Sequence, residues 1–71
     1  MIPYKSKTGK RSGVTAYRIE DDRIIIEFNN LEKYTYSYRS AGKTAIEKMK
    51  SLAIAQRGLS TFISKENPGY E

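Results

Sequence analysis

The clearest chemical motif lies at residues 37–44, which read Ser-Tyr-Arg-Ser-Ala-Gly-Lys-Thr. This run differs at one position, Ser37, from the pattern G-x-x-x-x-G-K-[ST], in which backbone N–H groups and a lysine hold phosphate groups. A nucleotide site of that kind also needs a parallel sheet and a magnesium-binding acid, for which we expect no room in 71 residues. Gly42, Lys43 and Thr44 therefore predict at most an anion-binding turn at a helix N-terminus.

Two other groups of side chains have the types needed for catalysis. Ser40 and Lys43 have the spacing of a serine–lysine nucleophile pair, but we interpret Ser40 as a helix cap and Lys43 as a solvated side chain. Asp21 and Asp22 are adjacent acids, which we assign to a turn. The sequence contains no histidine and no cysteine, so the commonest general base and the usual transition-metal ligands are missing. We therefore expect no enzyme activity, no cofactor and no metal site.

The net charge of +5 is concentrated near the start of the chain. Residues 1–13 contain four of the 13 basic residues and no acidic residue, so residues 14–71 contain nine basic and eight acidic residues. The four are Lys5, Lys7, Lys10 and Arg11. Basic arms bind nucleic acid in many proteins, although a solvated tail that keeps a small domain soluble has the same composition. We expect residues 1–13 to form a basic, flexible tail.

Three strands are predicted over residues 14–20, 23–28 and 33–39, because these runs alternate in polarity or are rich in β-branched and aromatic residues. The turn residues Asp21-Asp22 and Asn29-Asn30 separate them. A two-residue loop at Asp21-Asp22 gives the cross-strand pairs Glu20–Arg23, Ile19–Ile24, Tyr17–Ile26 and Thr15–Phe28. This register makes one face of the sheet apolar and places an acid opposite a base on the other face.

The length of the second turn decides which face the tyrosines join, because a slip of one residue exchanges the faces of a strand. A two-residue loop places Ile26 opposite Lys33 and leaves the tyrosines on the open face, where they could stack on single-stranded bases. A three-residue loop pairs Ile26 with Tyr34 and Ile24 with Tyr36. We favour the longer loop, because it keeps Lys33 in solvent and buries the aromatic rings.

The second half of the chain has helical periodicity. A main helix is predicted from a cap at Ser40 or Thr44 to about Arg57, with Gly58 as its stop, and a short second helical turn follows over residues 59–63. Residues 65–71 contain Asn-Pro-Gly and predict a frayed end. The predicted core consists of Tyr17, Ile19, Ile24, Ile26, Phe28, Tyr36, Ile46, Met49, Leu52, Ala53, Leu59, Phe62 and Ile63. The predicted fold class is α+β: a three-stranded antiparallel meander with the main helix and a short second helix on one face.

This order of elements resembles the KTSC domain. An aliphatic strand that ends in Phe28, the segment Tyr34-Thr35-Tyr36, a helix, and Gly58 followed by Phe62-Ile63 carry the resemblance, which covers about residues 14–64. The family takes its name from the C-terminus of some lysyl-tRNA synthetases and also occurs as single small bacterial proteins.

The chain departs from the family pattern at two places. Leu31 stands near the position where members tend to have a glycine before the Tyr-x-Tyr segment, and Ser40-Ala41 stands where Val-Pro tends to follow it. The resemblance implies an α+β fold and, through the synthetase connection, RNA binding. It implies no mechanism and no catalytic residue.

We therefore expect a binding module with RNA or another nucleic acid as its leading partner. The tail would contact phosphates, and the open sheet face would add Arg18, Arg23, Lys33 and Arg39. The alternative is a protein-interaction or self-association module that uses a sheet edge, in which case binding depends on Thr35 and Ser37. No apolar run approaches the length of a membrane span and no signal peptide is recognised, so we expect no membrane partner and a cytoplasmic location.

Overall fold

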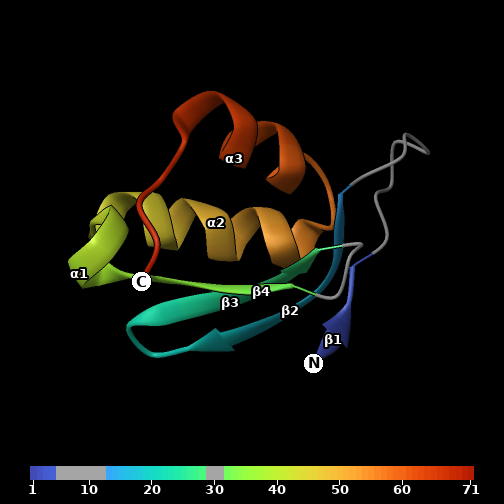
Figure 1. Cartoon of the computed structure of the whole chain (residues 1–71). Helices are drawn as coiled ribbons and strands as arrows, with labels where there is room; N and C mark the ends of the chain where they lie inside the picture. Colours follow the sequence, from blue (N-terminus) through green and yellow to red (C-terminus); the bar gives the residue numbers. More distant parts are fainter. Residues whose placement is uncertain (5–12, 29–31) are drawn as a thin grey trace.

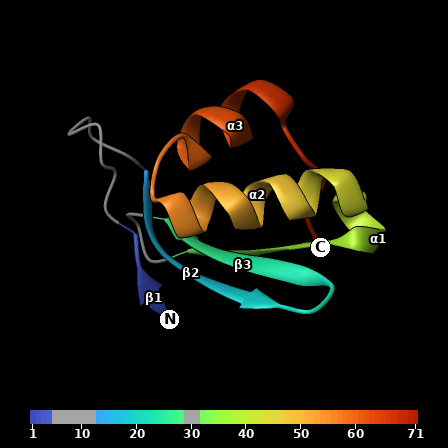
Figure 2. The same cartoon turned by 180° about the vertical axis from the view of Figure 1, so that it is seen from behind.

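The computed structural model describes residues 1–4, 13–28 and 32–71. Within these residues the chain forms a four-stranded antiparallel sheet in the order β1-β2-β3-β4. The strands are β1 (Ile2–Pro3), β2 (Val14–Glu20), β3 (Arg23–Phe28) and β4 (Lys33–Ser37), and the helices are α1 (Tyr38–Ala41), α2 (Lys43–Ala55) and α3 (Leu59–Glu66). Helix α2 lies against one face of the sheet, and α3 lies on the same side (Figure 1, Figure 2). The predicted α+β class is confirmed.

The β2–β3 hairpin has the predicted register along most of its length. The confirmed pairs are Glu20–Arg23, Ile19–Ile24 and Tyr17–Ile26. The predicted pair of Thr15 with Phe28 is wrong, because a β-bulge between Val14 and Ala16 makes Val14 the partner of Phe28. An extra residue on one strand reverses the alternation beyond it, so Val14 is buried in the core and Thr15 is exposed.

The β3–β4 pairing confirms the register of the three-residue loop. Ile24 lies opposite Tyr36 and Ile26 lies opposite Tyr34, so both tyrosines face the helices. Tyr36 is buried and Tyr34 is half-buried. Residues 29–31 of the connection lie outside the described residues. The strand ends at Ser37, two residues earlier than predicted.

Strand β1 was not predicted, because the expected sheet was a three-stranded meander. It lies within residues 1–13, which we expected to form a flexible tail. Its pairs are Ile2–Tyr17 and Pro3–Ala16. Tyr4, directly after β1, is buried in the core, and its hydroxyl accepts a hydrogen bond from the backbone N–H of Leu59 at 3.2 Å. Two residues are too few to show alternation, so the sequence carried no signal for this strand.

The helices begin at other residues than predicted, because Ser37 forms a cap that the sequence analysis did not recognise. Its hydroxyl accepts from the N–H of Ser40, and the Ser40 hydroxyl accepts from the N–H of Ser37, a capping box that starts the short helix α1. Helix α2 then starts at Lys43, with Gly42 (φ 91°) as its N-cap residue and no side-chain cap. The predicted caps at Ser40 and Thr44 are therefore wrong, and a third helix is present among the described residues.

The core lies between the sheet and the helices. Its buried members are Tyr4, Val14, Tyr17, Ile24, Ile26, Tyr36, Ile46, Met49, Ala53 and Leu59. The predicted core residues Ile19, Phe28, Leu52, Phe62 and Ile63 pack against it as half-buried side chains. Two buried residues, Tyr4 and Val14, were not in the predicted core. Tyr4 follows β1, and Val14 faces the core because of the bulge. No helix within the described residues is long and apolar enough to cross a membrane.

Candidate functional site

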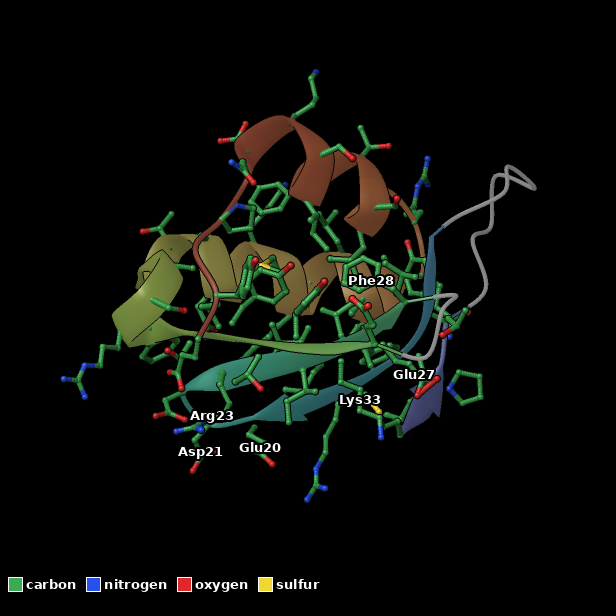
Figure 3. The ribbon with its side chains drawn as sticks, viewed as in Figure 1. Glu20, Asp21, Arg23, Glu27, Phe28 and Lys33 are labelled. Atoms are coloured by element: carbon green, nitrogen blue, oxygen red, sulfur yellow. The ribbon has the colours of Figure 1, made fainter. Side chains whose placement is uncertain are left out.

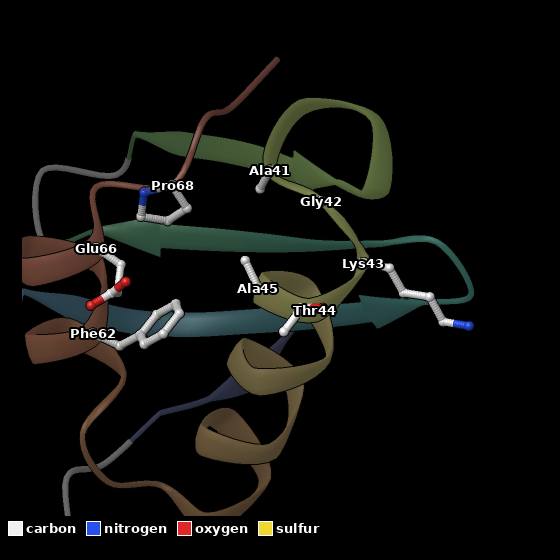
Figure 4. A pocket seen from close by; sticks show the side chains of 8 residues that line it. All are labelled: Ala41, Gly42, Lys43, Thr44, Ala45, Phe62, Glu66 and Pro68. Atoms are coloured by element: carbon white, nitrogen blue, oxygen red, sulfur yellow. The ribbon is translucent and has the colours of Figure 1, made fainter.

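The turn at Gly42, Lys43 and Thr44 lines a pocket of about 470 Å³ but does not form a phosphate cradle. The sheet beside it is antiparallel, and Ser37, which replaces the first glycine of the motif, belongs to the α1 capping box instead. Figure 4 shows the Lys43 side chain extending away from the pocket wall formed by Phe62, Glu66 and Pro68. The Glu66 carboxylate adds a negative charge to that wall, which opposes anion binding.

The open sheet face carries three of the four predicted basic residues, and two of them form ion pairs. Arg18 Nε lies 3.2 Å from the Glu20 carboxylate, and Arg23 Nε lies 3.0 Å from the carboxylate of Asp22. The hydrogen bond from Arg23 holds the pKa of Asp22 below its usual range. This face therefore has mixed charge, with Glu20 and Arg23 toward the β2–β3 turn in Figure 3.

The other two predicted basic residues differ in position. Lys33 is exposed and lies opposite Glu27 on the same face, and Figure 3 shows both at the far end of the sheet from Arg23. Arg39 is exposed on α1, so its predicted place on the open face is wrong, because β4 ends before it. Lys5, Lys7, Lys10 and Arg11 lie outside the described residues. No continuous basic surface is formed by the described members of the predicted set.

The aromatic rings gather on the helix side of β4. The ring of Tyr70 lies 4.8 Å from that of Tyr34 and 5.9 Å from that of Tyr36, measured between centroids, and Phe28 lies 5.3 Å from Tyr34. The Tyr34 hydroxyl donates to the Glu32 carboxylate at 2.6 Å, which raises the pKa of Tyr34. A stacking platform for bases on the open face is therefore not formed by Tyr34 and Tyr36.

We expected residues 65–71 to be frayed, but residues 65 and 66 belong to α3, and residues 67–71 return from α3 to β4, as the red segment in Figure 1 shows. The N–H of Glu71 donates to the carbonyl oxygen of Thr35 at 2.8 Å, and the Ser37 hydroxyl donates to the Glu71 carboxylate. The Ser40 hydroxyl donates to the carbonyl oxygen of Gly69 at 2.9 Å. We call residues 67–71 the strap.

The strap contacts side chains from both faces of β4 at the outer edge of the sheet. The Tyr70 ring packs on Tyr34 and Tyr36, whose side chains face the helices. The Glu71 carboxylate reaches Ser37, whose side chain alternates to the other face. Sequence reasoning had identified Thr35 and Ser37 as edge positions but missed the strap, since one tyrosine after Pro68-Gly69 has no periodicity.

The two outer strands of the described sheet differ in their cover. Strand β1 pairs with β2, both of its residues are exposed, and the Pro3 carbonyl oxygen accepts a hydrogen bond from the Gln56 side chain at 3.3 Å. On β4 the strap supplies one backbone hydrogen bond, at Thr35. The edge of β4 is thus a surface that receives a segment from elsewhere in the chain.

A polar cluster fixes the β2–β3 turn to the helices. The Lys50 ammonium donates to the carbonyl oxygen of Asp21 at 2.8 Å and lies 3.1 Å from the Glu47 carboxylate. The Tyr38 hydroxyl donates to the same carboxylate at 2.6 Å, which lowers the pKa of Glu47. These contacts are between neighbouring elements and hold the sheet in place under α2.

Among the described residues no group of three or more His, Cys, Asp and Glu side chains is arranged to hold a metal ion. The chain matches no family model, no curated protein and no solved structure. The resemblance to the KTSC domain therefore stays a prediction.

Proposed function

We propose that this chain is a protein-binding module without catalytic activity, which takes up a short polypeptide segment at the outer edge of β4. The observation that carries the proposal is the hydrogen bond from the N–H of Glu71 to the carbonyl oxygen of Thr35. An edge strand recruits another segment through such backbone bonds, and side-chain contacts then select the segment.

The geometry of β4 supports this choice. Because the Thr35 carbonyl faces away from β3, its N–H faces the same outer side, as in any antiparallel strand. Ser37 is nearly fully buried, at 2% exposed, and its hydroxyl is directed to the Glu71 carboxylate as well as to Ser40. The edge therefore combines a backbone acceptor with a buried hydroxyl donor.

Peptides selected on the full chain test the proposal. Thr35→Pro removes the outward N–H without breaking a β3–β4 hydrogen bond and keeps the Thr35 carbonyl acceptor, so it should weaken binding of peptides that pair with this edge as a strand by about tenfold. Thr35→Val is the matched control, because it keeps the backbone N–H and the β-branched shape. Peptides that bind wild type and Thr35→Pro equally would refute strand addition at this edge, which uses both backbone groups of Thr35.

Nucleic-acid binding is the second candidate, and the location of the charge favours it. Lys5, Lys7, Lys10 and Arg11 carry +4 of the net charge of +5, and the resemblance to the KTSC domain points to RNA. The described part of the chain supports it less, because Arg18 and Arg23 are already paired with acids. Nucleic-acid binding should weaken steeply between about 50 and 200 mM salt, whereas binding of an uncharged peptide at the β4 edge should not.

A further inference from the structure

We infer that the β4 edge selects a segment with a glycine, an aromatic residue and an acidic residue in succession, supplied by a partner protein, and that residues 69–71 of this chain occupy the same site in cis. This inference rests on the proposed function, because it names the class of segment that the edge would take. Each of the three positions is defined by a separate contact.

The glycine position is set by a close approach to α1. A Cβ atom on Gly69 would overlap with the carbonyl oxygen of Ser40, which is backbone and cannot rotate away. The carbonyl of Gly69 meanwhile accepts from the Ser40 hydroxyl at 2.9 Å. A residue with any side chain at this position is therefore excluded unless the segment moves away from β4.

The aromatic position is set by two rings of β4. Tyr70 lies at 34° to the ring of Tyr34 and at 74° to the ring of Tyr36, so one contact is tilted stacking and the other is edge-to-face. Aromatic pairs in these arrangements contribute more than their buried area alone. The two β4 rings thus form a contact site that an aromatic side chain fills better than an aliphatic one.

The acidic position is set by the Ser37 hydroxyl and lies near the positive charge of Arg23. Ser37 donates to the Glu71 carboxylate, and Arg23 is the cross-strand partner of Ser37. The hydrogen bond to Asp22 is the main cause that raises the pKa of Arg23, and the charge of Glu71 adds a smaller contribution. An acid is therefore preferred over its amide at this position.

The occupant is exchangeable, because few contacts hold it. Tyr70 remains 58% exposed, and a hydrogen bond that replaces one to water contributes only about 1 kcal/mol. A tethered segment nevertheless competes at an effective concentration in the millimolar range. A partner segment should therefore bind weakly to the wild-type chain and more tightly when the strap is displaced.

A labelled peptide tests this competition. The probe is acetyl-Glu-Asn-Pro-Gly-Tyr-Glu-amide, the sequence of residues 66–71 with both ends capped, titrated by fluorescence anisotropy. Gly69→Ala displaces the strap and should bind the probe about tenfold or more tightly than wild type. Gly13→Ala is the matched control, because a Cβ there meets Phe28 at an ordinary 3.8 Å, and it should bind as wild type does.

Variants of the probe test each position. Replacing its glycine by alanine, its tyrosine by leucine or its last glutamate by glutamine should each weaken binding to Gly69→Ala. If circular dichroism shows that Gly69→Ala is unfolded, Tyr70→Ala combined with Glu71→Gln weakens the strap instead: it removes the aromatic contact and the carboxylate charge, adds no side chain at Gly69, and leaves the backbone bonds to Thr35 and Ser40. That double variant should also bind the probe more tightly than wild type.

The outcomes separate the inference from the proposed function. Strap variants that bind other selected peptides in a Thr35-dependent way but not this probe would overturn the inference and leave the proposed function standing. Strap variants that bind no peptide at all would overturn both. A dimer of the wild-type chain in sedimentation that is lost in Gly69→Ala would assign the occupant to a second copy and overturn the partner protein as its source.

Discussion

The backbone N–H of Glu71 donates a hydrogen bond to the carbonyl oxygen of Thr35 at 2.8 Å, and this bond ties the strap to the outer edge of the sheet. The same strap places Tyr70 on one face of β4 and the Glu71 carboxylate at Ser37. A strand edge that binds part of its own chain offers the backbone groups and side-chain contacts that a partner segment would use.

Tyr4 should be essential for stability although it precedes most of the fold. Tyr4→Phe leaves the N–H of Leu59 without its acceptor in a buried position, which should lower the free energy of unfolding by about 1 to 2 kcal/mol. Tyr4→Ala also empties a core position and should cost about 3 to 5 kcal/mol. Urea denaturation followed by circular dichroism measures both. A Tyr4→Ala variant as stable as wild type would contradict the packing of this segment.

Because Tyr4 packs in the core, truncation is not a suitable test of the basic segment. Removing residues 1–12 would remove β1 and Tyr4, so a loss of RNA binding in that truncation would also follow from unfolding. Changing Lys5, Lys7, Lys10 and Arg11 to glutamine keeps Tyr4 and removes the charge. If nucleic acid is a partner, this variant should lose most of its RNA affinity at about 50 mM salt. Unchanged RNA affinity would exclude these four residues as the phosphate contacts.

Ser37→Ala should destabilise the chain and loosen the strap together. The hydroxyl caps α1 and donates to the Glu71 carboxylate, and loss of such a cap costs about 1 kcal/mol. Ser51→Ala is the control, because among the described residues its hydroxyl bonds only to the Glu47 carbonyl within α2, and alanine favours a helix. Equal unfolding free energies for the two variants would contradict the capping role of Ser37.

Acid should weaken the link between the β2–β3 turn and α2. The hydrogen bonds from Tyr38 and Lys50 lower the pKa of Glu47, so its ionised form favours the folded state. That contribution is present above the carboxyl's ordinary value of 4.5 and is lost as the pH falls through the lowered pKa. Glu47→Gln should therefore show a smaller loss of stability between neutral and acidic pH than wild type. An identical pH dependence in urea denaturation would contradict this assignment.

The sheet was largely predictable from the sequence, because alternation fixes which residues share a face. Ile24 and Ile26 opposite Tyr36 and Tyr34 followed from keeping Lys33 out of the core. Strand β1 was not predictable, because two residues carry no period. The bulge near Thr15 was also missed, since residues 14–16, which form it, include no glycine or proline to mark it.

The candidate site was predictable only in part, for a similar reason. Thr35 and Ser37 were recognised as edge positions because they belong to an outer strand. Their occupant was missed, since the strap depends on single tertiary contacts at Gly69 and Tyr70 rather than on a repeated pattern. Arg39 was predicted on the open sheet face but lies on α1, because the capping box at Ser37 ends β4 early. Strand propensity does not reveal such a local cap.

Chemical-shift mapping tests the central claim most directly. The ¹⁵N-labelled full chain, as wild type and as Gly69→Ala, would be titrated with a peptide selected on the wild-type chain. We expect the amide signals of Thr35, Ser37 and Ser40 to move in both proteins, and at lower peptide concentration in Gly69→Ala. Shifts confined to the open sheet face around Arg18, or to the pocket around Thr44, would contradict a binding site at the edge of β4.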